Sequence, residues 1–186
     1  MSVQAAPEPG GRAAVDELFS AEAIAKRVDE MGREIATRVD RDCMVIAVLK
    51  GSFVFSADLI RSLHRAGMRP RIDFLTLSSY GEGTESSGTV QITRDITDDV
   101  RGVDVLLVDD ILESGRTLAF AKKFLEERGA KSVSLCVFLN KPNRRKMAIE
   151  ADYVGFNCPD QFVVGYGLDF AHYYRELPFV GVVRQG

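Results

Sequence analysis

The sequence predicts an α/β fold in which a parallel sheet is flanked by helices. Two largely apolar runs, 43–49 and 103–108, have the length of strands and do not alternate as half-exposed strands do. The second run is followed by a polar turn at 109–115, a helical pattern at 116–128 and a third apolar run at 132–139. Strand, helix and strand joined by short connections indicate a parallel βαβ unit.

The elements before and after this unit follow from periodicity. Apolar residues recur at helical intervals between Val15 and Val39, which predicts one or two helical pieces with Ser20 as an N-cap. A second helix is expected from Phe53 to Ala66, with Gly67 as its stop. Further strands are expected at 71–77 and 90–96, and short ones that form a small cap at 153–156, 162–164 and 180–183. Residues 1–12 are predicted to be a flexible tail, and residues 13–186 a single domain.

Composition narrows the class of protein and its partners. The chain has 186 residues and a net charge of -3, which weighs against nucleic acid as the main partner. Three scattered cysteines predict reduced core thiols in a cytosolic protein. No apolar run approaches the roughly 20 residues that cross a bilayer, so no membrane partner is expected and the cytoplasm is the default location.

The turn from Asp109 to Thr117 carries the strongest chemical signal. It follows an apolar strand, where ligands of open parallel sheets bind, and its Ser114-Gly115-Arg116-Thr117 segment opens a helix. Free N–H groups, two hydroxyls and a glycine at a helix start predict a phosphate cradle. Asp109 and Asp110 beside it suit ribose hydroxyls, directly or through a metal. Neither the P-loop pattern nor the dinucleotide-binding glycine pattern is present.

The segment 105–118 resembles the phosphoribosyl pyrophosphate signature of the type I phosphoribosyltransferases. Four further segments resemble motifs of the hypoxanthine (hypoxanthine-guanine) phosphoribosyltransferases in order and spacing: Leu49–Ser52, Ser79-Tyr80, Lys141, and Phe162–Asp169 with Arg175. The resemblance covers residues 40 to 183. It implies a type I phosphoribosyltransferase-like sheet with a small hood from the C-terminal and N-terminal segments and a mobile lid loop at about 78–95.

The resemblance implies a Mg²⁺-dependent reaction in which a purine nitrogen replaces pyrophosphate on the anomeric carbon of the activated ribose. Its implied 5′-phosphate and ribose contacts are Asp109, Asp110, Ser114, Gly115, Arg116 and Thr117. Glu113 stands where the family usually has an aspartate that handles the proton at N7 of the purine. Its extra methylene moves the carboxylate outward by about one bond, which makes this the role that departs from the family pattern.

The remaining implied roles lie on other segments. Lys50, Gly51 and Arg175 are expected at pyrophosphate, Lys141, Phe162, Val163 and Asp169 at the base, Ser79 and Tyr80 on the lid, and Asp109, Asp110 and Asp169 at Mg²⁺. Lys141 offers only donors, so it suits the 6-oxygen of hypoxanthine or guanine and opposes the amino group of adenine. Without the resemblance, the sequence would favour a simpler interpretation of these residues: Lys50, Lys141 and Arg175 as exposed surface residues. Phe162 and its neighbours would be interpreted as a core strand.

Two alternatives remain beside a purine-salvage transferase. One is a phosphoribosyltransferase for another base, such as xanthine-guanine, uracil or orotate; Lys141 and Phe162 favour a 6-oxopurine. The other is a nucleotide-sensing, RNA-binding regulator on the same scaffold, which the acidic balance opposes. The preference between hypoxanthine and guanine is not readable, and the resemblance implies a homodimer or homotetramer.

Overall fold

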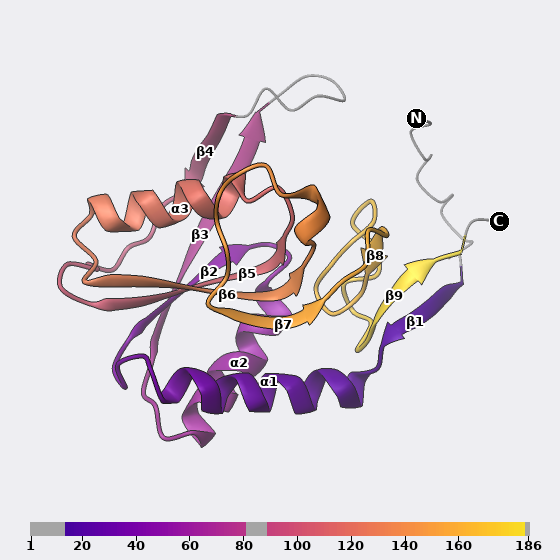
Figure 1. Ribbon diagram of the computed structural model, residues 1–186, viewed down its shortest axis with the longest axis horizontal. Coiled ribbons are helices and arrows are strands. Elements are labelled where there is room, and N and C mark those ends of the chain that lie inside the picture. Colours follow the sequence, from indigo (N-terminus) through magenta and orange to yellow (C-terminus); the bar gives the residue numbers. More distant parts are fainter. Residues whose placement is uncertain (1–13, 81–88, 185–186) are drawn as a thin grey trace.

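The computed structural model describes residues 14–80 and 89–184, and its centre is a six-stranded sheet (Figure 1). The strand order is β4-β3-β2-β5-β6-β7, parallel except for β4, which is antiparallel to β3. The bounds are β2 Met44–Leu49, β3 Arg71–Tyr80, β4 Thr89–Arg94, β5 Asp104–Leu112, β6 Ser132–Asn140 and β7 Tyr153–Asn157. The expected α/β fold is confirmed.

Helices cover both faces of this sheet, as Figure 1 shows. Helices α1 (Ala21–Ala36) and α2 (Phe53–Arg65) pack on one face, and α3 (Arg116–Glu127) packs on the other. Each helix turns one apolar stripe inward, so two separate core clusters sandwich the sheet. The central strands β2 and β5 are buried on both sides, which explains their near-continuous apolar sequence.

A second, three-stranded sheet lies beside the first and has the order β1-β9-β8. It joins both ends of the described chain: β1 (Val15–Phe19) pairs antiparallel with β9 (Val180–Val183), which pairs with β8 (Val163–Val164). This sheet is the expected hood. The helical prediction for residues 15–19 is wrong, because pairing with β9, distant in sequence, overrides the local period. The helix begins only after Ser20, whose hydroxyl accepts a bond from the N–H of Ala23 at 3.2 Å.

Three other expectations from the sequence differ from the structure. Strand β5 continues through the acidic pair to Leu112, because Ile111 and Leu112 pair with Leu139 and Asn140 of β6. The short strand expected at 153–156 belongs to the main sheet as β7 instead of a cap. The lid expected at about 78–95 overlaps β3 and β4.

Parts of two predictions fall outside the described residues. These are the central part of the lid, 81–88, and the tail at 1–12. Within residues 14–80 and 89–184, no helix is long and apolar enough to span a membrane.

Candidate active site

Three loops meet at the carboxyl edge of the parallel sheet, where ligands of such folds bind. They follow β2, β5 and β6, and a pocket of about 400 Å³ opens beside them. Six residues predicted from the sequence line it: Asp110, Glu113, Lys141, Phe162, Val163 and Asp169. Four others line it as well and were not predicted: Ile111, Arg144, Gln161 and Leu168. Segments more than 50 residues apart in the chain thus form one cavity.

The acidic pair at the end of β5 is divided between the interior and the pocket. Asp109 is 6% exposed, while Asp110 is half-buried and lines the cavity. Burial, and then the charge of Asp110, raise the pKa of the Asp109 carboxyl well above its ordinary value. Each carboxylate accepts one backbone N–H, from Asp110 at 2.9 Å and from Ile111 at 3.0 Å respectively. The pair is therefore held in place before any ligand arrives.

The loop from Glu113 to Gly115 leads into α3 and has the features of the predicted cradle. Gly115 has φ 81°, and a Cβ there would collide with Ile149, so both conformation and space require glycine. Ser114 presents its carbonyl to the N–H groups of Lys146 and Met147, at 2.9 and 3.1 Å. The N-cap residue of α3 is Gly115, which has no side chain to cap the helix, and the hydroxyl of Ser114 accepts the N–H of Arg116 at 3.4 Å. The start of a helix also carries the positive end of the helix dipole, a feature that suits an anion such as phosphate.

Glu113 lies among cations contributed by the segment after β6. Its Oε1 is 3.2 Å from Nη1 of Arg144 and 3.9 Å from Nζ of Lys141. Its carbonyl accepts a 3.0 Å bond from Nη1 of Arg145, whose Nη2 donates to Asn140 Oδ1 at 2.6 Å. Burial lowers the pKa of the Arg145 guanidinium from its ordinary value. Both the backbone and the side chain of Glu113 are therefore fixed from one neighbouring segment.

The loop after β2 packs directly on the acidic pair. The Leu49–Lys50 peptide bond is cis, and Gly51 follows it. A Cβ on Gly51 would overlap the carboxylate of Asp110, and a Cβ on Gly167 would overlap the carbonyl oxygen of Gly51. The two glycines thus let the loop after β2 lie directly against the Asp110 carboxylate on one side and the backbone at Gly167 on the other. This contact places the predicted pyrophosphate loop next to the predicted ribose-binding acid.

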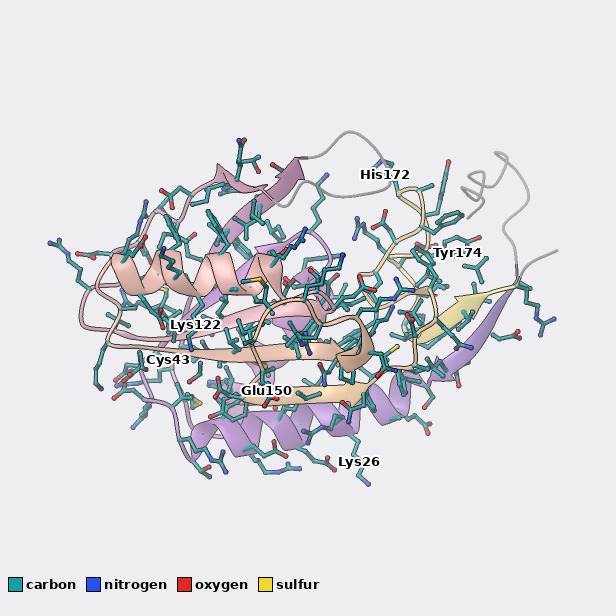
Figure 2. All side chains as sticks on the ribbon, turned by 45° about the horizontal axis from the view of Figure 1, so that its top comes forward. Lys26, Cys43, Lys122, Glu150, His172 and Tyr174 are labelled. Carbon is teal, nitrogen blue, oxygen red and sulfur yellow. The ribbon has the colours of Figure 1, made fainter. Side chains whose placement is uncertain are left out.

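Arg175 and Asp169, predicted for pyrophosphate and Mg²⁺, form an ion pair. Nη2 of Arg175 lies 2.6 Å from Oδ1 of Asp169, and Nη1 donates to the carbonyl of Gly167 at 2.6 Å. The second oxygen of Asp169 accepts the N–H of His172 at 2.9 Å. His172 and Tyr174, labelled in Figure 2, belong to this loop beyond β8. The structure therefore brings the two predicted residues together, although Arg175 does not line the pocket.

The far wall of the pocket has the properties of a base site. Lys141 is only 7% exposed, and its Nζ donates to the carbonyl of Gln161 at 2.8 Å. Phe162 is 55% exposed, so it lies outside the core strand formed by the buried Val163 and Val164. Its ring meets Phe170 edge to face at a centroid distance of 5.4 Å. A buried ammonium and an exposed ring in one cavity can bind a planar ring that carries an acceptor.

Two of the predicted site residues lie at the end of a strand of the main sheet. Ser79 and Tyr80 end β3, opposite Val90 and Thr89 of β4. Their predicted lid role remains a prediction.

Two arginines of the basic turn after β6, Arg144 and Arg145, were not predicted from the sequence. The segment Lys141-Pro-Asn-Arg-Arg145 contains three cations at a strand end that faces the pocket, and this clustering was the available signal. Within the described residues, no group of three or more His, Cys, Asp or Glu is arranged to hold a metal ion.

The sheet edge, the acidic pair and the helix-start loop are the features expected of a domain that binds phosphorylated ribose. A family model described as "Phosphoribosyl transferase domain" matches residues 14–171. The hypoxanthine-guanine phosphoribosyltransferase of Bacillus subtilis is 45% identical over 168 residues, which are 90% of this chain and 92% of that protein. The crystal structure of a hypoxanthine-guanine phosphoribosyltransferase from Bacillus anthracis has a TM-score of 0.85 and 44% identity, covering 91% of this chain and 98% of that one.

These matches show that the chain belongs to the phosphoribosyl transferase family, in the group of hypoxanthine and hypoxanthine-guanine phosphoribosyltransferases. It also matches the bifunctional protein TilS/HprT of Listeria monocytogenes, at 45% identity over 90% of this chain. The chain spans only 26% of that relative's length.

Proposed function

We propose that the protein transfers the phosphoribosyl group of phosphoribosyl pyrophosphate to hypoxanthine, and to guanine, releasing pyrophosphate and the nucleoside monophosphate. The observation that carries the choice of base is Lys141, a buried cation in the same pocket as the exposed ring of Phe162 and the carboxylate of Glu113. A stacking ring, a donor and a proton acceptor are the three groups that the chemistry of a 6-oxopurine requires.

The helix-start loop binds the sugar phosphate. Ser114, Gly115, Arg116 and Thr117 hold the 5′-phosphate, because the start of α3 combines backbone N–H groups, the positive end of the helix dipole and two hydroxyl side chains. Asp109 and Asp110 accept hydrogen bonds from the ribose hydroxyls.

The transition state resembles an oxocarbenium ion, with positive charge on the sugar and negative charge on the departing pyrophosphate. Lys50, Gly51 and Arg175 surround the pyrophosphate, so that developing charge meets fixed donors. Ser79 and Tyr80 belong to the lid that closes over the site and excludes water. Glu113 takes the proton from the purine as its nitrogen attacks the anomeric carbon.

Base selectivity follows from the donor character of Lys141. Hypoxanthine and guanine present a 6-oxygen to the ammonium, while adenine presents an amino group and would bury two donors against each other. Phe162 stacks on the purine, and the backbone of Val163 pairs with the base edge.

Mg²⁺ fits the oxygen ligands at this site. Asp110 and Asp169 both line the pocket, whereas Asp109 is buried beneath it, so we place the ion on the first two. Mg²⁺ commonly takes one or two carboxylates and completes its shell with phosphate oxygens and water. When bound, it would neutralise charge on the pyrophosphate.

We further propose a homodimer or homotetramer that works in the cytoplasm. Phe53 is 45% exposed at the start of α2, beside a second pocket lined largely by apolar groups such as Leu177 and Pro178. The three cysteines are buried and free of disulfides, as expected for a reducing compartment. Light scattering of the purified protein would test the oligomeric state.

Initial rates on a panel of bases with phosphoribosyl pyrophosphate and Mg²⁺ test the proposed activity. We expect inosine monophosphate from hypoxanthine, and rates with adenine lower by a factor on the order of 10⁴, because the buried donor would lose its acceptor.

Lys141→Met should lower kcat/KM for hypoxanthine by about 10- to 100-fold. Lys131→Met is the matched control, since Lys131 is an exposed lysine paired with Asp104 at the other end of β5. Equal or better use of uracil would remove the purine assignment.

A further inference from the structure

Arg144 is a half-exposed arginine that contacts two carboxylates from distant parts of the chain. It ends the short turn η1 (Pro142–Arg144), just after Lys141. Its Nη1 lies 3.2 Å from Oε1 of Glu113, and its Nε contacts Oδ1 of Asp160. Arg144 also lines the base pocket together with Glu113. One guanidinium therefore joins the β5–α3 loop to the segment before β8 at the edge of the cavity.

These contacts matter because Glu113 is longer than the aspartate usual at this position. The extra methylene adds a rotatable bond, so the carboxylate has more orientations to lose before it can accept a proton from a fixed purine nitrogen. The backbone below it is already held, because Arg145 donates to the carbonyl of Glu113 at 3.0 Å. Only the side chain remains to be directed, and the cations that approach it are Arg144 and, at 3.9 Å, Lys141.

Stability does not explain the arrangement. Arg144 is 52% exposed, Glu113 41% and Asp160 44%, and ion pairs at such exposure contribute little to folding. A guanidinium, however, is a planar fork that can engage one carboxylate along each edge, which an ammonium on a flexible stem does poorly. Asp160 thus fixes the plane of the guanidinium, and the guanidinium fixes the carboxylate of Glu113.

We propose that Arg144, oriented by Asp160, is a positioning residue that aims the Glu113 carboxylate at the purine and so makes a glutamate effective where the family usually has aspartate. The inference rests on the proposed proton-accepting role of Glu113. Arg144 acts through Glu113 and binds neither substrate.

The first test is the split between turnover and substrate binding in Arg144→Met. We expect single-turnover rates and kcat to fall by about tenfold, a part of the full effect of an acid–base group. The KM values for hypoxanthine and phosphoribosyl pyrophosphate should stay within about threefold, because ground-state contacts are kept. Arg144→Lys should recover part of the loss, and Asp160→Asn should show a smaller loss in the same direction.

The decisive test is a double-mutant cycle with Glu113→Asp. An aspartate carboxylate is too short to reach Arg144, so Arg144→Met should change kcat by less than about twofold in the Glu113→Asp background. Arg101→Met is the matched control: this arginine is 78% exposed, is paired with Asp99 and lies near the amino end of β5. Arg101→Met should leave kcat and the KM values unchanged. Thermal midpoints of all variants should match that of the parent protein.

Two results would overturn the inference. One is an unchanged kcat in Arg144→Met, and the other is an equal loss in the glutamate and aspartate backgrounds. Glu113→Gln separates this failure from that of the underlying role. If Glu113→Gln lowers turnover while Arg144 shows no coupling, only the positioning role is lost. If Glu113→Gln leaves turnover unchanged, both the proton-accepting role and the inference are lost.

Discussion

Asp109 couples the stability of the ligand-free protein to pH. Its ordinary pKa is 3.8, and burial followed by the charge of Asp110 raises it well above that value in the folded chain. Between these two values, the folded protein holds a proton that the unfolded chain has released. Stability is therefore lost as pH rises through this range, the reverse of the usual behaviour of a paired carboxylate.

This linkage predicts the effect of Asp109→Asn on the metal-free protein. The amide keeps the shape and removes the ionisable group, so we expect the variant to gain in thermal midpoint relative to the parent as pH rises. The difference should grow by a few degrees, as an order-of-magnitude estimate, between about pH 4.5 and pH 7.5. Thermal melts at a series of pH values, with chelator present, measure it.

Asp99→Asn is the control for this series. Its hydrogen bonds to Arg101 lower the pKa of Asp99 to about 2, so its contribution is lost only as pH falls toward that value. The difference between Asp99→Asn and the parent should therefore stay constant across the same range. A constant difference for Asp109→Asn as well would contradict the linkage.

At the scale of elements, Asp73 ties β3 to the chain that leads into β5. Asp73 is 7% exposed and accepts bonds from the N–H of Thr97 at 2.6 Å, the hydroxyl of Thr97 at 3.1 Å and the N–H of Asp98 at 3.1 Å. A further bond comes from the N–H of Phe74 at 2.7 Å. Burial alone would raise the pKa of Asp73, but these bonds outweigh it and lower the pKa. The carboxylate therefore anchors the segment after β4.

We expect Asp73→Asn to lower the free energy of unfolding by about 1–3 kcal/mol, because an amide nitrogen would face a donor where the carboxylate oxygen accepts one. Urea denaturation at neutral pH measures the change. Asp40→Asn provides the comparison, since Asp40 is exposed and accepts one bond, from the N–H of Asp42 at 2.8 Å. Its effect should stay within about 0.5 kcal/mol. Equal effects of both variants would show that Asp73 is no anchor.

At the scale of the whole molecule, the cysteines report on global opening. Cys43, Cys136 and Cys158 are all buried within one core cluster, and Cys43 is labelled in Figure 2. Burial raises the pKa of each thiol, that of Cys43 to about 11. Because only the thiolate reacts, the folded protein should resist thiol reagents.

A thiol titration at about pH 8 checks this expectation. The folded protein should show no fast-reacting thiol, and the protein in denaturant should show three per chain, which is the number of free cysteines. The slow labelling rate should fall when substrates bind, because ligands that bind only the folded state suppress opening. One fast thiol per folded chain would mean that part of this core opens locally.

Much of this organisation was predictable from the sequence. The strands around Ile46 and Leu107 are buried on both faces, and continuous apolar runs predicted them. The loop at Ser114 and Gly115 was predicted as a phosphate cradle, because free N–H groups at a helix start are a local property of the chain. The family resemblance added the pocket residues Lys141 and Phe162, and the structure places both in one cavity.

Only the tertiary structure decided the features that depend on partners far away in the chain. The strand at Val15–Phe19 exists because β9 pairs with it, and β5 extends past Asp110 because β6 does. The contacts of Arg144 with Glu113 and Asp160 likewise join separate loops. Periodicity and capping are set by neighbours a few residues apart and can be read locally. Strand pairing and ion pairs between loops depend on how the chain folds back on itself, so no local sequence pattern predicts them.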